Sequence, residues 1–151
     1  MKSIACIGLI NPKTPANIGG AIRAAGCYGA TMVAYTGRRY KKQSVLITDP
    51  QHFVKQIPLI TIDDLKLIIP HGCIPVAIEL NANAKSLCTY KHPRQAFYIF
   101  GAEDATLGKK VLSWCKDIVY VPTNGCMNLA ATVNVLLYDR MNKMKGETNE
   151  I

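Results

Sequence analysis

The sequence predicts an α/β fold, in which a mostly parallel β-sheet is flanked by helices. The first observation behind this prediction is an alternation along the 151 residues, in which apolar runs of strand length take turns with segments of helical periodicity. The second is that polar loops follow these strands. In a parallel sheet such loops gather at the carboxyl ends of the strands, where ligands bind. The length is that of one domain.

The first strand and the first helix show the pattern most clearly. Residues 3–10 are apolar and β-branched and stop at Asn11 and Pro12, which predicts a buried strand ended by a turn. A helix is expected over residues 18–28, where alanine and glycine dominate, with Asn17 at the position of its N-cap.

The remaining elements follow the same alternation. Asp63 and Asp64 stand where first-turn acids favour a helix, and Pro122 ends the last strand. Residues 81–94 are polar and irregular. Further strands are expected over residues 31–36, 58–62, 75–80, 96–100 and 118–121, and further helices over residues 65–69, 107–115 and 128–144.

The chain is expected to form one domain over residues 1–144, followed by a polar tail over residues 145–151. Apolar runs stay well short of the roughly 18–20 residues that cross a bilayer. The apolar start of the chain lacks the small-residue cleavage site of a signal peptide and predicts the first strand instead. We therefore expect a cytoplasmic protein without membrane contact.

Charge and cysteine usage narrow the choice of partner. Lys and Arg total 18 against 10 Asp and Glu, and the formal charge of +8 favours either a polyanionic partner or a generally solvated basic surface. The six cysteines lack C-x-x-C spacing, so we expect no metal site and reduced cysteines in the core. The scattered His52, His71 and His92 are expected in surface loops.

Three loops that follow predicted strands carry the chemistry. The first enters a helix that bears Arg23, whose planar, permanently charged guanidinium suits phosphate. The second passes from a strand through Gly101 to Glu103, and the third enters the last helix at Asn128. Each alone is an ordinary turn between a strand and a helix.

Together and in this order, the three segments resemble the motifs of the SpoU/TrmH branch of the SPOUT RNA methyltransferases, over nearly the whole chain. Within the branch, the last helix and the length are similar to those of the single-domain TrmL-type tRNA (cytidine/uridine-2′-O)-methyltransferases. The corresponding patterns are N-x-G-x-x-x-R at residues 17–23, F-G-x-E at residues 100–103, and P…S-x-N at Pro122 and residues 126–128.

This resemblance implies a fold, a reaction and an assembly. The family fold threads the C-terminal part of its parallel sheet into a trefoil knot, an exception to the usual absence of knots. The implied reaction transfers a methyl group from S-adenosylmethionine (AdoMet) to the 2′-hydroxyl of an RNA ribose, with tRNA as the expected substrate. A homodimer is the implied assembly.

The resemblance also implies site residues, which we carry over position by position. Arg23 would orient the ribose and stabilise the developing alkoxide, with the other catalytic candidates placing substrate or side chains. The catalytic candidates are Arg23, Asn17, Glu103 and Asn128, and the cofactor-binding candidates are Ile78, Gly101, Val121, Cys126, Met127 and Leu129.

A basic loop is the candidate RNA contact, formed by Arg38, Arg39, Lys41 and Lys42 around Tyr40. Such a loop can grip phosphates and stack a base, and a solvated surface loop is the alternative.

The sequence departs from the family pattern at three positions. Cys126 stands where the family usually has serine, Ala102 where proline is frequent, and Ala130 where a hydroxyl residue is frequent. Three alternatives to the tRNA enzyme stay open: an rRNA 2′-O-methyltransferase, a catalytically inactive RNA-binding module of the same fold, and an unrelated doubly wound domain that binds a small nucleotide.

Overall fold

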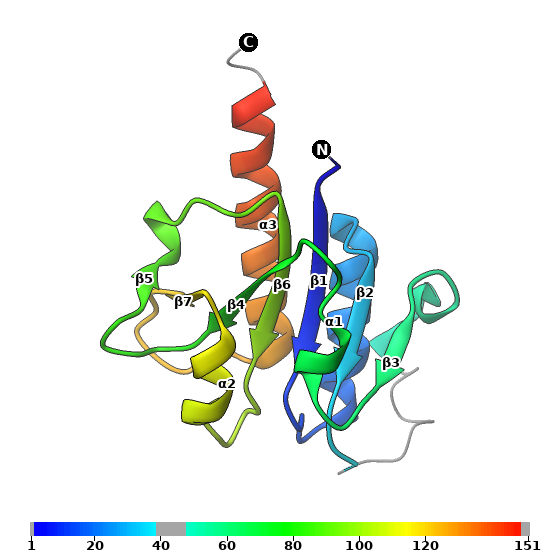
Figure 1. Cartoon of the computed structure of the whole chain (residues 1–151). Helices are drawn as coiled ribbons and strands as arrows, with labels where there is room; N and C mark the ends of the chain where they lie inside the picture. The colour runs from blue at the N-terminus through cyan, green and yellow to red at the C-terminus, as the bar shows by residue number, and fades with distance from the viewer. Residues whose placement is uncertain (1, 39–47, 149–151) are drawn as a thin grey trace.

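A parallel sheet forms the centre of the molecule, which confirms the predicted α/β class (Figure 1). The computed structural model describes residues 2–38 and 48–148. Over these residues the sheet has seven strands in the order β3-β2-β1-β6-β4-β7-β5, and the strand pairs are parallel. The strands are β1 Ile4–Leu9, β2 Met32–Tyr35, β3 Leu59–Thr61, β4 Ile74–Ile78, β5 Lys85–Ser86, β6 Gln95–Phe100 and β7 Asp117–Tyr120.

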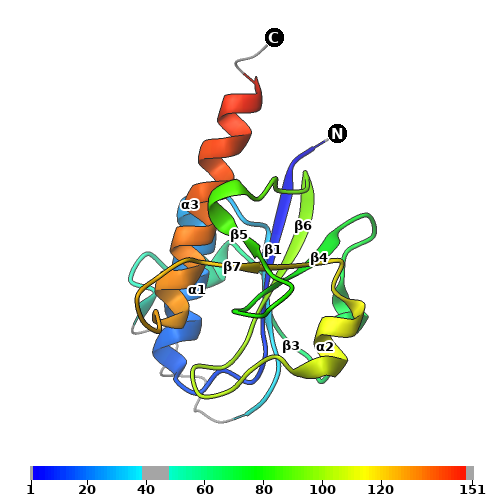
Figure 2. The same ribbon diagram turned by 90° about the vertical axis from the view of Figure 1, so that its left-hand side faces the viewer.

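Two long helices and one short helix accompany the sheet over the described residues. The α-helices are α1 Pro15–Tyr28, α2 Gly108–Trp114 and α3 Leu129–Thr148, and the 3-10 helices are η2 Phe53–Lys55, η3 Leu65–Ile68 and η4 Leu87–Thr89. Figure 2 shows α1 and α3 on one side of the sheet and α2 on the other.

The two faces of the sheet bury separate apolar cores. On the first face, Ile18 and Ile22 of α1 and Leu136 of α3 pack with side chains such as Ile7 and Tyr98 from the strands. Leu65, Phe97, Ile99 and Leu107 belong to the core of the second face. Successive side chains of a strand point to opposite faces of the sheet, so the central strands β1 and β6 contribute to both cores and are buried on both sides.

The helices α1 and α3 approach one another closely at a glycine. A Cβ atom added at Gly20 would lie 2.7 Å from the Cβ of Ala130, a distance that real Cβ atoms do not adopt. Gly20 and the small Ala130 therefore let the two helices meet next to the carboxyl ends of the strands.

The register of the sheet brings the loops of the three motifs to one edge. Leu9, the last residue of β1, pairs with Phe100, the last residue of β6, and Phe100 pairs with Ile78, the last residue of β4. Ile78 in turn pairs with Val119 of β7. The residues that follow these strands therefore lie together at the carboxyl edge, which is the lower end of the arrows in Figure 1.

Several predicted boundaries are wrong. Helix α1 begins at Pro15, and Thr14 rather than Asn17 occupies its N-cap. Proline has the backbone angle of a first helical residue already fixed, and this sets the start three residues earlier. The expected helix over residues 65–69 is a single 3-10 turn, η3. Helix α3 continues to Thr148, four residues beyond its expected end at residue 144.

The expectation that His92 lies in a surface loop is wrong. Its side chain is buried, its Nδ1 lies 2.7 Å from the hydroxyl of Tyr98, and its Nε2 lies 2.8 Å from Oδ2 of Asp139. Arg140, also buried, donates to that hydroxyl and to the backbone carbonyls of Pro93 and Arg94. This network fastens α3 to the amino-terminal edge of the sheet, opposite the motif loops.

The cysteines are free, as expected, but only some of them lie in the core. Cys6 and Cys73 are buried, whereas Cys27, Cys88 and Cys126 are exposed. Within the described residues, no helix has the length and apolar character that crossing a membrane requires.

Candidate functional site

Three side chains, one from each motif, form a hydrogen-bonded cluster at the carboxyl edge of the sheet. Asn17 is the central member and is buried, with 6% of its surface exposed. Its Nδ2 donates to the carboxylate of Glu103 and, at 2.7 Å, to Oγ1 of Thr14. Its Oδ1 accepts from Nδ2 of Asn128 at 2.9 Å. The structure thus joins side chains that are 86 and 111 residues apart along the chain.

Glu103 lies against the start of α1. Its Oε2 accepts from the backbone N–H of Lys13 at 2.8 Å, and its Oε1 accepts from the hydroxyl of Thr14 at 3.2 Å. Partial burial acts to raise the pKa of Glu103, but hydrogen bonds from its own backbone, Lys13, Asn17 and Thr14 outweigh it and lower the pKa below the ordinary value. The ionised carboxylate therefore serves as an acceptor that fixes Asn17, and it stands at a helix end that favours negative charge.

Asn128 is fixed from two sides. Its Oδ1 accepts from the backbone N–H of Ala131 at 3.1 Å, as an N-cap side chain does at the start of α3. Its carbonyl oxygen accepts from the backbone N–H and from the hydroxyl of Thr132. Because its amide oxygen is bound to the backbone of α3 and its amide nitrogen to Asn17, the side chain of Asn128 has a single defined orientation.

Arg23 shares an open hollow with the amide members of this cluster. The hollow has a volume of ≈ 710 Å³, and its wall includes Asn17, Gly20, Arg23, Asn128 and Asn134. Arg23 is exposed on α1, so its guanidinium is available to an anionic ligand that enters the hollow. The guanidinium of Arg23 and the hydrogen-bonded amides of Asn17 and Asn128 therefore border the same hollow.

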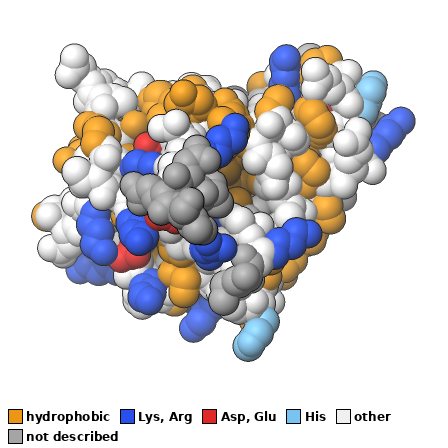
Figure 3. Space-filling view, turned by 90° about the horizontal axis from the view of Figure 1, so that it is seen from above, with side chains coloured by type: hydrophobic (Ala, Val, Ile, Leu, Met, Phe, Trp, Pro, Cys, Tyr) orange, Lys and Arg blue, Asp and Glu red, His pale blue; other side chains and the backbone are white. Residues whose placement is uncertain are grey.

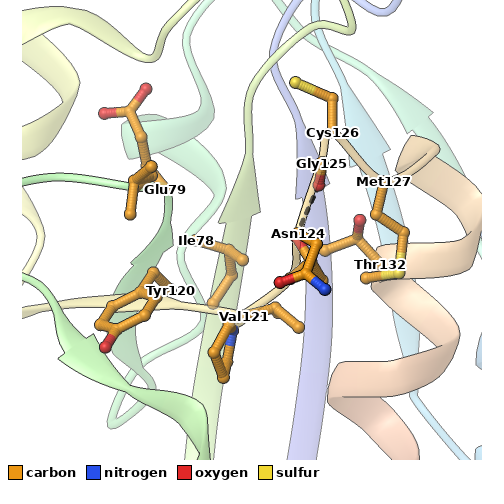
Figure 4. A pocket seen from close by; sticks show the side chains of 12 residues that line it. Ile78, Glu79, Tyr120, Val121, Asn124, Gly125, Cys126, Met127 and Thr132 are labelled. Carbon is orange, nitrogen blue, oxygen red and sulfur yellow. Dashed lines mark hydrogen bonds between the residues drawn. The ribbon is translucent and has the colours of Figure 1, made fainter.

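A separate cavity of ≈ 700 Å³ adjoins the ends of β4 and β7 (Figure 4). Figure 4 shows Ile78 and Val121 in the middle of the view, Glu79 and Tyr120 to one side, and Met127 and Thr132 to the other. The walls are formed largely by apolar side chains and by backbone, and Thr123 donates to the carbonyl of Gly125 at 2.6 Å within the loop that borders the cavity. The volume is that of a site for a ligand of nucleoside size or larger.

Four of the six cofactor candidates line this cavity: Ile78, Val121, Cys126 and Met127. The other two do not belong to its lining. Leu129 is buried in the core at the start of α3, and Gly101 lies at the end of β6 with Leu107 packed behind it. The thiol of Cys126 is exposed.

Of the predicted RNA contacts, Arg38 is exposed and follows β2 at the same edge of the sheet. Arg39, Lys41 and Lys42 lie outside the described residues. Basic side chains are not confined to this edge, because Figure 3 shows Lys and Arg spread over the opposite end of the molecule with few acids among them. The net charge of +8 is thus widely distributed.

The sequence reasoning missed Glu79, Thr14 and Asn134. Glu79 lines the apolar cavity, Thr14 bridges Asn17 and Glu103, and Asn134 lines the hollow of Arg23. A usable signal existed for Glu79, since it is a charged residue near the end of an otherwise apolar predicted strand. Asn134 gave no comparable signal, because it lies inside the predicted last helix.

The fold and the site together define a parallel α/β protein with a ligand cavity and a polar cluster at the carboxyl edge of its sheet. The sequence model of the SpoU rRNA Methylase family matches residues 5–138, and the chain belongs to this family. None of the curated proteins compared with the chain matches it in sequence.

Solved structures of SpoU and TrmH proteins share the fold. The SpoU methyltransferase AviRb from Streptomyces viridochromogenes, in complex with AdoMet, has 17% sequence identity and a TM-score of 0.81 over 97% of this chain and 62% of its own. The TrmH/SpoU tRNA modifying enzyme of A. aeolicus has 16% identity and a TM-score of 0.83, over 97% and 78% of the two chains.

A third similar structure concerns the 2-OH methylation of C/U34 on tRNA. It has 22% identity and a TM-score of 0.80, over 95% of this chain and 98% of its own. The chain spans less than two thirds of the length of AviRb.

Proposed function

We propose that the chain is an AdoMet-dependent RNA 2′-O-ribose methyltransferase that acts on tRNA. The observation that carries the proposal is the cluster of Asn17, Glu103 and Asn128, whose two amide members share a hollow with Arg23, next to an apolar cavity lined by Met127. Membership of the SpoU family supports RNA methylation. The similar structure that concerns 2-OH methylation of tRNA supports the ribose and tRNA parts of the proposal.

The cavity at β4 and β7 fits AdoMet. Its ≈ 700 Å³ lie within the range of small-molecule sites, and Ile78, Val121 and Met127 offer apolar surfaces for the faces of an adenine ring. The backbone of residues 121–127 offers N–H and C=O groups for its polar edge. When bound, AdoMet supplies an electrophilic methyl group on a sulfonium.

We place the trefoil knot of the family in the same region. In the sheet order, β4 lies between β6 and β7, and β7 lies between β4 and β5, so the C-terminal strands interleave in space. This order supports a threaded connection around the cofactor cavity.

The chain's own residues prepare the RNA hydroxyl for attack. Arg23 binds the phosphate next to the target ribose and orients the 2′-hydroxyl, and its positive charge stabilises the oxygen as the hydroxyl proton passes to solvent water. Asn17, locked by Glu103, holds Asn128 in place, and Asn128, also fixed at the start of α3, offers its second amide N–H to the sugar without having to reorganise. Arginine stays protonated near neutral pH, so we assign it no role as a general base.

Two further features belong to the proposal. The described part of one chain offers only a small platform for RNA, and we propose that a homodimer provides the complete one. The free cysteines suit a reducing compartment, which supports a cytoplasmic location.

The experiment that tests the proposal combines the protein with AdoMet and unmodified tRNA and identifies the nucleosides by mass spectrometry after digestion. A 2′-O-methylnucleoside is the expected product. A base-methylated nucleoside would contradict the ribose assignment, and product from rRNA alone would contradict the tRNA assignment. RNA binding without AdoMet binding in calorimetry would instead identify an inactive module.

A further inference from the structure

Glu79 connects the wall of the proposed cofactor cavity to the loop that carries Glu103. It is the first residue after β4, and its backbone N–H donates to the carbonyl of Val119 at 2.9 Å. Its Oε1 accepts from the backbone N–H of Leu107 at 2.6 Å. One side chain thus bridges the end of a central strand and the end of the second motif loop.

The loop over residues 101–107 is anchored at both ends. At its start, Gly101 directly follows β6, and the side chain of Leu107 packs behind it, with Cδ2 3.5 Å from the position that a Cβ of Gly101 would take. Leu107 itself is 6% exposed and belongs to the core of the second face. Glu103 lies in the middle of this loop, and its carboxylate reaches Lys13, Thr14 and Asn17.

The chemistry of the cavity makes the Glu79 bond consequential. Among the described residues that line the cavity, Glu79 alone is charged. A half-buried carboxylate beside apolar walls needs a hydrogen-bond donor, and the N–H of Leu107 meets that need. The same bond fixes the last residue of the loop before α2, so the cavity wall and the loop depend on each other.

We propose that Glu79 is a positioning residue that holds the Glu103 loop in place and connects cofactor binding to the Asn17 cluster. A ligand that settles against the end of β4 restricts Glu79, which restricts Leu107 and the loop that carries Glu103. Glu103 then holds Asn17, and Asn17 holds Asn128. The inference rests on the proposed function for the reaction that the cluster serves, whereas the link between Glu79 and the loop stands without it.

Hydrogen–deuterium exchange on the purified protein tests the link. Glu79→Ala removes the acceptor and should speed exchange over residues 101–107 by about tenfold, whereas Glu79→Gln keeps an acceptor oxygen and should exchange like the unchanged protein. Asp64→Ala is a matched control, because it removes a carboxylate acceptor from a different backbone N–H, that of Lys66 at the start of η3. Should Glu79→Ala fail to fold, Glu79→Met keeps the length and apolar volume without a strong acceptor.

Kinetics with tRNA and AdoMet give the second readout. Glu79→Ala should lower kcat about tenfold, with rescue by Glu79→Gln. Combined with Glu103→Gln, the two losses should be less than additive, since both act through Glu103.

Two results would overturn the proposal. The first is unchanged exchange over residues 101–107 in Glu79→Ala. The second is an equal loss of AdoMet affinity in Glu79→Gln and Glu79→Ala, because it would show that the charge of Glu79 acts on the cofactor directly. If the unchanged protein neither binds AdoMet nor methylates RNA, the proposed function fails, and the exchange experiment still decides the link.

Discussion

Asn17 is the residue on which the candidate site depends, because one short amide serves three partners. Its nitrogen donates to Glu103 and Thr14 while its oxygen accepts from Asn128. An aspartate has a similar shape but no donor, and a serine cannot reach all three groups. An amide at this position can therefore be replaced only at a cost to the whole cluster.

Arg23→Ala should lower methyl transfer to tRNA by at least about a hundredfold, because it removes the cation that we assign to the RNA phosphate and the developing oxyanion. AdoMet binding should persist, since Arg23 lines the hollow and not the apolar cavity. Single-turnover rates and calorimetry measure the two effects. Arg23→Lys keeps the charge but lacks the planar guanidinium, so its rate should lie between those of the unchanged protein and Arg23→Ala. Full activity in Arg23→Ala would contradict the role that we assign to Arg23.

Asn17→Asp should destabilise the protein by about 2–4 kcal/mol at neutral pH, because it buries a second carboxylate against Glu103 and removes a donor. Repulsion between the two acids raises the pKa of the pair in the folded state. The loss of stability caused by Asn17→Asp is therefore complete at neutral pH. It should become smaller as the pH falls and the pair of carboxylates takes up a proton.

Urea unfolding at pH 7.5 and 4.5 measures this change. Adding Glu103→Gln should recover part of the lost free energy at pH 7.5 by removing one of the charges. A penalty that stays the same at both pH values would show that the new carboxylate does not face Glu103.

At the scale of elements, helix α3 connects the two edges of the sheet. Its first turn is fixed by Asn128 at the carboxyl edge, and three turns later Asp139 and Arg140 contact His92 and Tyr98 at the amino-terminal edge. A neutral His92 fits this network, in which Arg140 donates to the Tyr98 hydroxyl, that hydroxyl donates to Nδ1, and Nε2–H donates to Asp139. Protonation of Nδ1 would break this order.

The stability of the fold should therefore fall in mildly acidic solution. Burial is the largest effect and lowers the pKa of His92 below its ordinary value of 6.5, against the hydrogen bond and charge of Asp139, which act to raise it. The charges of Arg140 and Lys143 make smaller contributions in the same direction as burial. As the pH falls through 6.5, His92 takes up a proton in the unfolded chain but not in the folded one, so the free energy of unfolding decreases until the pH reaches the folded pKa. Above pH 6.5, His92 makes no pH-dependent contribution to the free energy of unfolding.

Urea unfolding at several pH values between 8 and about 5.5 checks this expectation. His92→Gln should be less stable at pH 8 but should lose less on acidification, whereas His71→Gln, at an exposed histidine, should retain the slope of the unchanged protein. Equal slopes in all three proteins would mean that His92 does not titrate in this way.

At the scale of the whole molecule, sequence patterns predicted the parallel sheet and the gathering of the three motif loops at one edge, because residues that follow parallel strands must come to one edge. The patterns failed where a tertiary contact decides the outcome. His92 lies in a polar segment, and only its partners on β6 and α3 explain its burial. The bond from Leu107 to Glu79 depends on two loops whose approach no local pattern encodes.

The homodimer is the last expectation, and the surface of α3 suggests where it forms. Val135 and Tyr138, three residues apart on α3, are 40% and 55% exposed, and the ring of Tyr138 lies 6.5 Å from that of Tyr28 on α1. Light scattering after size exclusion should give twice the mass of one chain. Tyr138→Glu should reduce this to a monomer and weaken tRNA methylation, because a charge cannot be buried unpaired in an apolar interface. Leu67→Glu, at an exposed leucine on η3, should remain dimeric. A monomeric unchanged protein would contradict the dimer, and a Tyr138→Glu dimer would place the interface elsewhere.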